Sequence, residues 1–366
     1  MKRNSLEWLV VIFTVIFIAV GGIKLHKKYL ANQIKQRIND EFSAPSIPIP
    51  EKPAKPKFPQ SPTISNKIPA YLEYAGVVAQ LKEWNIQAKD LTEIGTYGQS
   101  SKGTDLYYIR INNKFDLKPK PKVLITACIH GNEPHSTGCV MGYAGIILAE
   151  YGKNQEITDL VNSRDIYIIP IISPDSYPHS RDVNGVDPNR NFPGPNNPNK
   201  ESVPPIKAVQ DFFLKIKPNA VISGHTFGRV FLTPFGDKND FCLDHTEYQR
   251  IVGQMGEICQ YKIKRACEVY GRPIYGTEID WYYLNNAFKT LPNGKTIHSG
   301  AFSVVMEFGT HQRIPTHKEI VDEFNMTWKA FLYFLQEAPK VEIWWDESGR
   351  SVNPDGSLKT SWLRAA

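Results

Sequence analysis

Short β-rich runs recur along the middle of the chain, and several are apolar at consecutive positions. They cover residues 105–112, 122–129, 165–172, 220–224 and 302–308. Between them, residues 69–84, 137–151 and 204–217 have the apolar periodicity of helices. Near-continuous apolar strands that alternate with helices are typical of a sheet buried on both faces. The pattern predicts an α/β fold with a mixed, mostly parallel central sheet and helices on both faces.

The N-terminus carries a different pattern. A short basic segment, residues 1–7, comes first. Residues 8–23 contain no charged side chain, and Lys24, Lys27 and Lys28 follow them. An uncharged stretch of this length is slightly short of the ~20 residues that span a bilayer and long for a signal-peptide core of ~7–15. We expect a single-pass transmembrane anchor, with the folded body on the non-cytoplasmic side. Cleavage after the small residues 19–21 is the alternative, and it would release a secreted protein.

A spacer is expected after the anchor. Residues 24–42 suit a short amphipathic stalk helix, and prolines recur nearly every third residue from Pro45 to Pro62. Such a run favours extended polyproline II. We therefore predict a stalk and Pro-rich linker over residues 24–68 and a folded domain over 69–340. Residues 341–366 form a polar C-terminal tail to which we assign no role.

The charge distribution argues against a nucleic-acid partner. The formal net charge is +6, but residues 1–68 hold eleven Lys and Arg against four Asp and Glu, which gives +7. The rest of the chain holds 32 against 33, which gives −1. A nucleic-acid enzyme more often places its positive charge on the folded body. The five cysteines form no CxxC pair, so zinc-finger and thioredoxin motifs are absent.

Two histidines and two glutamates follow or end apolar runs. His130 and Glu133 follow residues 122–129, His225 follows 220–224, and Glu307 is the next-to-last residue of 302–308. Ligands on such sheets gather beyond the carboxyl ends of the strands. Two His and one Glu can form a catalytic zinc site with an open fourth position, and a further carboxylate can shuttle a proton. Acid–base work without a metal, or a merely polar turn after residue 129, are the alternatives.

A loop rich in Gly, Pro, Asn and Asp lies between these residues, at 173–194. It carries Arg181 and the pair Asn189–Arg190. Arginine clamps carboxylates in a bidentate way and stabilises developing oxyanions. The loop is therefore a candidate for binding an anionic part of a substrate.

Five features follow one another along the chain. They are HGNE, GVDPNRNFPG, a lone histidine after an apolar strand (His225), GTEIDWYY, and a glutamate at the end of an apolar strand (Glu307). Together they resemble the zinc carboxypeptidases related to carboxypeptidase A, over roughly residues 69 to 336. The resemblance implies that family's fold, one Zn²⁺ per chain, and hydrolysis of a peptide bond near a free C-terminal carboxylate by zinc-activated water. With the N-terminal segment, it implies a membrane-tethered metallocarboxypeptidase.

The resemblance also implies roles for the residues that match the motifs. His130, Glu133 and His225 would bind zinc. Glu307 would be the general base and then the acid for the leaving amine. Arg181 would polarise the scissile carbonyl and hold the oxyanion.

Substrate-binding roles are carried over in the same way. Asn189 and Arg190 would hold the terminal carboxylate of the substrate. A mobile tyrosine of the family would correspond to Tyr270 or Tyr275, although neither has the expected spacing to the IDW segment. Ile279 stands where the family sets side-chain preference, and it implies an apolar terminal residue.

Three other functions remain open. A zinc amidohydrolase of the same fold would act on N-acyl amino acids or on cell-wall stem peptides, and an inactive scaffold would only bind peptides. The IDWYY segment and the long stretch between His225 and Glu307 favour a peptidase. His135 and His311 lie close to the motifs. We expect His135 to be a surface or helix-start residue and His311 to lie in a polar turn, with a zinc-ligand role for His135 and a substrate contact for His311 as the alternatives.

Overall fold

The computed structural model describes residues 68–194, 197, 201–237 and 241–359. The predicted anchor and nearly all of the predicted stalk and linker lie outside these described residues. All described residues belong to one compact unit, Gln60–Ala366. Across the described stretches, no helix combines the length and apolarity needed to cross a membrane.

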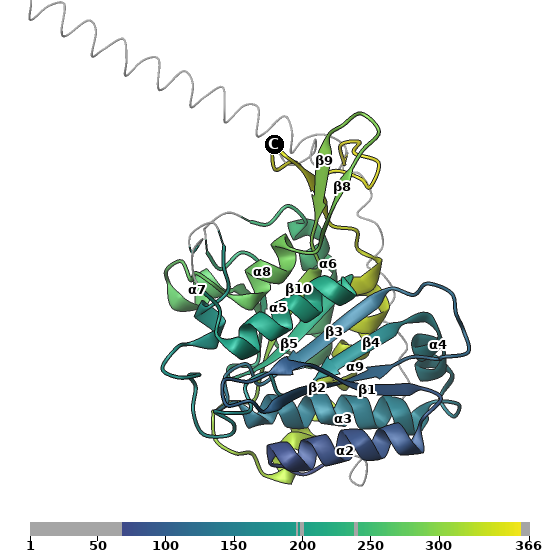
Figure 1. The fold of residues 1–366 in the computed structure, drawn as a ribbon, viewed down its shortest axis with the longest axis vertical. Helices are drawn as coiled ribbons and strands as arrows, with labels where there is room; N and C mark the ends of the chain where they lie inside the picture. Colours follow the sequence, from purple (N-terminus) through teal and green to yellow (C-terminus); the bar gives the residue numbers. More distant parts are fainter. Residues whose placement is uncertain (1–67, 195–196, 198–200, 238–240, 360–366) are drawn as a thin grey trace, which may run out of the picture. The chain divides into compact units, whose positions relative to one another are not determined.

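A mixed eight-stranded sheet forms the centre of the described unit, in the order β1-β2-β4-β3-β5-β10-β6-β7 (Figure 1). The pairings β4–β3, β3–β5, β5–β10 and β6–β7 are parallel, and β1–β2, β2–β4 and β10–β6 are antiparallel. The strands are β1 (Thr92–Gln99), β2 (Asp105–Ile111), β3 (Lys122–Ala127), β4 (Asp165–Ile169), β5 (Ala220–Thr226), β6 (Val230–Thr233), β7 (Lys262–Arg265) and β10 (Phe302–Phe308). The predicted mixed, mostly parallel sheet is confirmed.

Helices cover both faces of this sheet. Figure 1 shows α2 (Tyr74–Gln87) and α3 (Pro134–Glu150) on one side and α5 (Pro204–Ile216) and α8 (Glu278–Leu284) on the other. Every residue of β4 and β5 is buried as a result, which explains their unbroken apolar sequences. The remaining helices are α4 (Gln155–Ser163), α6 (His245–Cys259), α7 (Ala266–Tyr270) and α9 (His317–Glu337), with 3₁₀ turns at Pro188–Arg190 and Ala338–Lys340.

Small residues bring α3 and α9 into close contact. A Cβ atom on Gly138 would lie 2.8 Å from Ile320, and one on Gly142 would lie 2.9 Å from Phe324. On the same α3 face, Tyr143 stacks on Phe331 with ring centroids 3.9 Å apart. This packing holds α3 firmly, and α3 begins immediately after Glu133.

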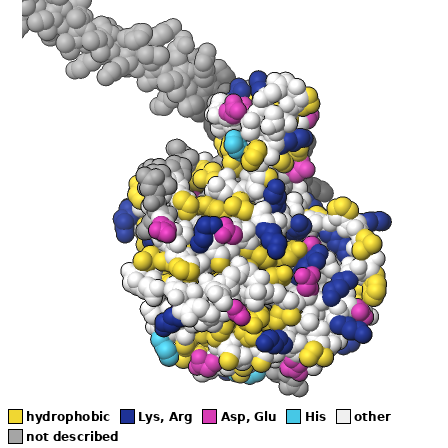
Figure 2. Space-filling view, in the orientation of Figure 1, with side chains coloured by type: hydrophobic (Ala, Val, Ile, Leu, Met, Phe, Trp, Pro, Cys, Tyr) yellow, Lys and Arg dark blue, Asp and Glu magenta, His cyan; other side chains and the backbone are white. Residues whose placement is uncertain are grey.

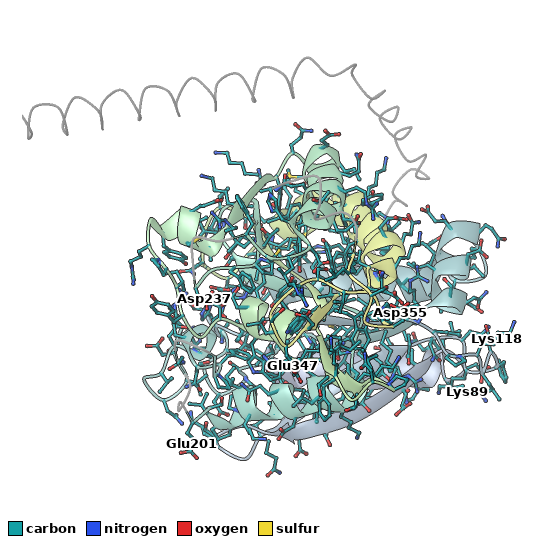
Figure 3. The ribbon with its side chains drawn as sticks, turned by 90° about the horizontal axis from the view of Figure 1, so that it is seen from above. Lys89, Lys118, Glu201, Asp237, Glu347 and Asp355 are labelled. Atoms are coloured by element: carbon teal, nitrogen blue, oxygen red, sulfur yellow. The ribbon has the colours of Figure 1, made fainter. Side chains whose placement is uncertain are left out.

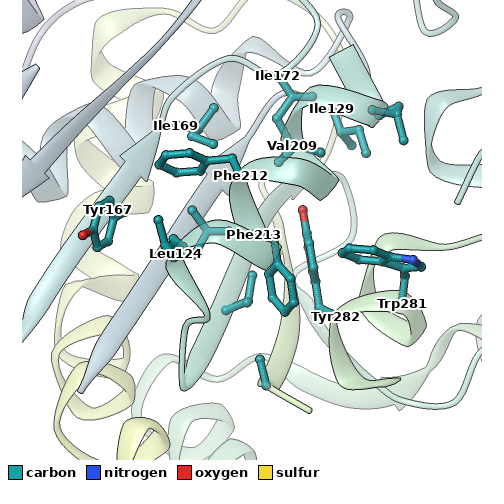
Figure 4. Close-up of a cluster of buried hydrophobic side chains, with 14 of the residues drawn as sticks. Leu124, Ile129, Tyr167, Ile169, Ile172, Val209, Phe212, Phe213, Trp281 and Tyr282 are labelled. Atoms are coloured by element: carbon teal, nitrogen blue, oxygen red, sulfur yellow. The ribbon is translucent and has the colours of Figure 1, made fainter. Parts of the chain in front are cut away.

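On the opposite face, an aromatic cluster fixes α8. Phe213 of α5 packs against Trp281 and Tyr282 of α8, with ring centroids 5.3 and 4.9 Å apart (Figure 4). A helix of only two turns is not stable alone in water, so its position depends on such packing. The cluster therefore determines where the first residues of α8 lie.

The predicted strands and helices are found with shifts of a few residues at their ends. The sequence analysis did not predict helices α4, α6, α7, α8 and α9, nor strands β1, β6 and β7 of the central sheet. The described part of the tail also contains β11 (Trp344–Asp346), which pairs with β9 (Thr296–Ser299), the partner of β8 (Ala287–Thr290). Since β11 completes this three-stranded sheet, residues beyond 340 belong to the folded unit.

Charges of both signs are interspersed on the face shown in Figure 2. In the view from above, Lys89 and Lys118 lie on one side of the molecule and Glu201 and Asp237 lie on the other (Figure 3). Among the described residues, the face of Figure 2 thus has no extended area of a single charge sign.

Candidate active site

Three neighbouring parallel strands bring the predicted residues to one edge of the sheet. Strand β5 lies between β3 and β10. His130 and Glu133 follow β3, His225 lies near the end of β5, and Glu307 lies near the end of β10. Glu307 is the register partner of His225. The site thus lies at the carboxyl ends of the parallel strands, as the pattern predicts.

The turn after β3 has a specific backbone shape. Cys128, the first residue after β3, has a φ of 51°, in the left-handed region that non-glycine residues seldom adopt. The Ser173 hydroxyl donates to the Ile129 carbonyl (2.6 Å), and the Ser136 hydroxyl donates to the Glu133 carbonyl (2.7 Å). These bonds hold the HGNE segment as a rigid loop, so its two polar side chains have fixed directions.

His130, Glu133 and His225 form one buried cluster whose candidate ligand atoms all lie within 4.8 Å of one another. The Glu133 carboxylate lies 2.8 Å from Nδ1 of His130 and 3.0 Å from Nδ1 of His225. Burial opposes ionisation of Glu133, but the two histidines hold the pKa of its carboxyl well below the usual range. Two imidazoles and one carboxylate converge on a common point, which is the arrangement that a metal ion requires.

Each histidine is held from behind by a second carboxylate. Nε2 of His130 lies 3.1 Å from Asp187, and Nε2 of His225 lies 2.6 Å from Glu278. A carboxylate acceptor keeps the proton on Nε2 and leaves Nδ1 with its lone pair for a metal. The donor set therefore fits zinc, which takes His and Glu ligands in catalytic sites and keeps a fourth position open.

Asp187 and Glu278 were not singled out by the sequence analysis. Both lie inside motifs that it quoted, GVDPNRNFPG and GTEIDWYY. A histidine that binds a metal usually donates its other ring N–H to a carboxylate or carbonyl. The two candidate ligand histidines could therefore have directed attention to carboxylates in these motifs that had no assigned role.

A pocket of about 370 Å³ opens beside the cluster. The residues to which the sequence analysis assigns roles line it, apart from the alternative Tyr275, namely His130, Glu133, Arg181, Asn189, Arg190, His225, Tyr270, Ile279 and Glu307. The structure therefore brings all of these side chains to a single cavity.

Arg181 has both a structural partner and a position at the pocket. Its Nε and one terminal nitrogen donate to Asp187 at 3.2 and 3.0 Å. The other terminal nitrogen lies 3.6 Å from the Glu133 carboxylate. Asp187 thus orients the guanidinium of Arg181 and the imidazole of His130 together.

Asn189 and Arg190 lie on the 3₁₀ turn that follows Asp187. Asn189 is buried, and its side-chain oxygen accepts a hydrogen bond from the backbone N–H of Glu278 (2.8 Å). The Arg190 guanidinium lies 5.7 Å from the centre of the Tyr270 ring, within cation–π range. This side of the pocket presents a cation and an amide to a bound molecule.

The structure distinguishes the two candidate tyrosines. Tyr270 lines the pocket at the end of α7 and is 51% exposed, whereas Tyr275 lines a separate small cavity. Tyr270 is therefore the tyrosine that can reach a molecule bound beside Arg190.

The inner wall of the pocket is apolar. Ile279 packs in a buried cluster with four aliphatic neighbours from β6, β10 and α7. The other members are Val230, Leu232, Ala266 and Val305. All of them except Val230 also line the pocket, so this wall offers no charged partner to a side chain that enters it.

Glu307 faces the pocket without belonging to the three-residue cluster. Burial raises the pKa of its carboxyl to about 7, the neighbouring histidines oppose that rise, and Glu133 adds to it. A carboxyl group poised near neutral pH can accept and release a proton, as a general acid–base residue must.

Gln312 is a further pocket residue that the sequence analysis missed. Its side-chain nitrogen donates to the Glu133 carboxylate (3.0 Å) and to the Thr226 carbonyl (3.1 Å). No motif signalled it, because it lies on an irregular loop after β10. It limits the directions that the Glu133 carboxylate can take.

His135 and His311 do not line the pocket. Their rings stack on each other, and each contacts Glu319 at the start of α9. His135 is buried in the first turn of α3, so the expected helix-start position is found and the surface position is wrong. His311 lies in the irregular segment after β10.

The sequence profile of the zinc carboxypeptidase family matches residues 77–330, more than half of the chain. Carboxypeptidase A2 of Rattus norvegicus is 27% identical over 202 residues, which cover 45% of this chain and 48% of that protein. Metallocarboxypeptidase A of Arthroderma otae is 24% identical over 258 residues, which cover 59% and 61%. The chain thus spans about half the length of the rat relative.

Solved structures share the fold. Thrombin activatable fibrinolysis inhibitor has a TM-score of 0.64 at 19% identity, and the match covers 74% of this chain and 75% of that one. Carboxypeptidase A of Helicoverpa armigera has a TM-score of 0.62 at 18% identity, with 74% of each chain covered. The resemblance inferred from the motifs is confirmed, and the chain belongs to the zinc carboxypeptidase family.

Proposed function

We propose that this protein is a zinc-dependent metallocarboxypeptidase that removes the C-terminal residue of a peptide. The observation that carries the proposal is the single pocket that joins the His130–Glu133–His225 cluster, Glu307 and Arg190. Such a pocket can hold a scissile bond and the terminal carboxylate of a substrate at the same time.

The chemistry is divided among the residues of the pocket. Zinc held by the three ligands would supply Lewis acidity, which polarises a carbonyl and lowers the pKa of bound water. Glu307 takes a proton from the attacking water and delivers it to the leaving amine. Arg181 donates to the carbonyl oxygen as negative charge develops on it.

Recognition of the terminal carboxylate falls to Arg190 and Asn189. A guanidinium matches a carboxylate in a bidentate geometry, which gives direction as well as affinity. Tyr270, which lies over Arg190 and is half exposed, can close over a bound terminus.

The apolar wall around Ile279 supports a preference for an apolar terminal side chain. Fully burying a Leu or Phe side chain contributes about 1.5–3 kcal/mol relative to leaving it exposed. A charged side chain would lose its hydration there without gaining a partner.

We also propose that the enzyme is tethered to a membrane by residues 8–23, with the catalytic domain on the non-cytoplasmic side. The support for this comes from the uncharged N-terminal segment and the Pro-rich spacer in the sequence. Membrane flotation of the full chain, compared with a variant lacking residues 1–23, tests it.

The test of the enzymatic proposal combines metal analysis with a substrate panel. We expect one zinc per chain and release of the C-terminal residue from N-blocked dipeptides with an apolar terminus, both measured on the purified full chain. Glu307→Gln serves as the inactive control. Turnover of N-acyl amino acids or muropeptides alone would replace this proposal with an amidohydrolase, and zinc binding without any turnover would indicate a peptide-binding scaffold.

A further inference from the structure

A third glutamate, Glu278, lies behind the metal cluster, and its side chain is fully buried. One of its carboxylate oxygens lies 2.6 Å from Nε2 of His225 and accepts a hydrogen bond from the Ser223 hydroxyl at 2.7 Å. These are short bonds to a charged acceptor. Glu278 does not line the pocket, so it acts through His225 and not on a substrate.

A buried polar chain continues from Glu278 into the sheet. The Thr126 hydroxyl of β3 donates to the Ser223 hydroxyl of β5 (2.9 Å), which donates to Glu278. The other Glu278 oxygen has no hydrogen-bond partner among the described residues. Burying a carboxylate with an unsatisfied oxygen costs folding free energy. This cost suggests that the residue serves something other than stability.

Glu278 is also linked to the predicted carboxylate-binding side of the pocket. It is the first residue of α8, and its backbone N–H donates to the side-chain oxygen of Asn189 (2.8 Å). The next residue, Ile279, forms the apolar wall. One short helix start therefore contacts the metal cluster, Asn189 and the apolar wall.

We propose that Glu278 is a positioning residue that holds His225 in the tautomer and orientation needed to bind zinc, and that its charge strengthens this metal site. The Glu278 carboxylate keeps the proton on Nε2 of His225 and directs Nδ1 toward the cluster. Partners of this kind typically change metal affinity 10–100-fold. The inference rests on the proposed zinc site and on no particular substrate.

Two variants separate the hydrogen-bond acceptor that Glu278 offers to His225 from its negative charge. Glu278→Met has nearly the same volume and offers no comparable acceptor to His225. Glu278→Gln keeps an oxygen for the Nε2–H bond and removes the negative charge. The matched control is Glu323→Gln, since Glu323 is a buried carboxylate whose described partners are Arg229 and Tyr261 and not a cluster histidine.

The experiment measures the zinc dissociation constant of each full-length variant by chelator competition, and the Tm of the zinc-free and zinc-loaded forms. We expect Glu278→Met to weaken zinc binding by about 10–100-fold and Glu278→Gln to weaken it by less. Glu323→Gln should leave the zinc Kd unchanged. The zinc-free Tm of Glu278→Met should fall, because the buried Nε2–H of His225 and the Ser223 hydroxyl lose their shared acceptor. The zinc Kd is therefore the deciding measurement, and zinc should raise the Tm of Glu278→Met by less than it raises that of the wild type.

Zinc Kd values within twofold of the wild type in both Glu278 variants would overturn the inference, while the proposed zinc site would stand. A zinc-free Tm that falls while the zinc Kd stays unchanged would also overturn it and show a purely structural role. If Glu278→Met does not fold, Glu278→Gln decides by whether its zinc Kd rises. No zinc binding by the wild type would overturn the proposed function itself.

Discussion

Glu307 lies directly opposite His225 in the register of the parallel strands β10 and β5. Both residues lie on paired strands and neither lies on a loop. Backbone hydrogen bonds between the strands therefore fix the Glu307 carboxyl group beside the candidate metal ligand His225. Sites built on strands are held more precisely than sites built on loops. This relationship places the proposed proton carrier and the proposed metal site in a constant geometry.

Glu307→Gln should lower kcat by about 10²–10⁴, the usual contribution of a general acid–base residue. The amide keeps the shape of the side chain but cannot take a proton. Zinc content should stay at the wild-type value, because Glu307 is not one of the three clustered ligands. Steady-state kinetics with elemental analysis of the same sample checks this, and activity within tenfold of the wild type would contradict the assigned role.

The activity should be lost toward acid pH. Burial raises the pKa of Glu307 to about 7, and the residue must be ionised to accept a proton. The ionised form is present above that pKa and disappears as the pH falls through it. A dication in the cluster would favour ionisation, so the acid limb of kcat should lie at or below pH 7. A pH–rate profile in which kcat stays constant down to pH 4 would count against Glu307 as the base.

The same raised pKa has a consequence for stability. The folded-state pKa of Glu307 exceeds its ordinary value of 4.5, so the protonated form is favoured in the folded state. Its contribution to stability is therefore present below pH 4.5 and lost as the pH rises toward 7. We expect zinc-free Glu307→Gln at pH 8 to have a Tm equal to or above that of the wild type, measured by calorimetry. A clearly lower Tm would show that the ionised carboxylate stabilises the fold.

Ile279→Asp should change the preferred terminal residue from apolar to basic. The substitution places one carboxylate on an otherwise aliphatic wall, where a Lys or Arg side chain can pair with it. The ratio of kcat/KM for a Lys-terminated over a Phe-terminated substrate should rise by at least about tenfold, within the range that pocket contacts supply. Ile279→Val is the control and should keep the apolar preference. An unchanged ratio in Ile279→Asp would place side-chain selection elsewhere.

Gly131 of the HGNE segment is expected to tolerate no side chain. A Cβ atom there would lie 2.4 Å from the backbone carbon of Ser176, so the loop would have to shift. Gly131→Ala should lower the free energy of unfolding by about 1–3 kcal/mol, as overpacking does, and should weaken zinc binding. Denaturant unfolding and chelator competition measure both effects.

Gly253 provides the control for that substitution. It lies within α6 and has no atom within 4 Å of an added Cβ. Gly253→Ala should leave zinc binding unchanged and raise stability by about 0.5–1 kcal/mol, since alanine favours helix over glycine. Equal losses in both variants would argue against a steric origin.

The residues that could be predicted from sequence are those whose place follows from strand order. His130, His225 and Glu307 end or follow apolar runs, and parallel neighbours bring such ends together. Helix α9, which packs against α3, was missed although the sequence carries a signal for it, the capping box of Thr316 and Glu319 at its start.

Residues whose role depends on tertiary distance were harder to predict. Glu278 is one of several charged residues in the sequence until folding places it 2.6 Å from His225. Neither Tyr270 nor Tyr275 has the expected spacing to the IDW segment, and only the folded chain shows that Tyr270, the last residue of α7, lines the pocket. Contacts between side chains that lie far apart in the sequence, such as Glu278 and His225, leave no pattern among neighbouring residues from which they could be predicted.

The most direct test of the central claim compares two peptides that differ only at the terminus. One ends in an apolar residue with a free carboxylate, and the other carries the same residue as an amide. The account predicts zinc-dependent release of the terminal residue from the free acid and at least about a hundredfold slower release from the amide, since losing one partner of a buried charge pair costs about 2–5 kcal/mol. Arg190→Ala should lose most of this discrimination. Equal cleavage of both peptides, or cleavage at an internal bond, would contradict the proposal that this pocket recognises a C-terminal carboxylate.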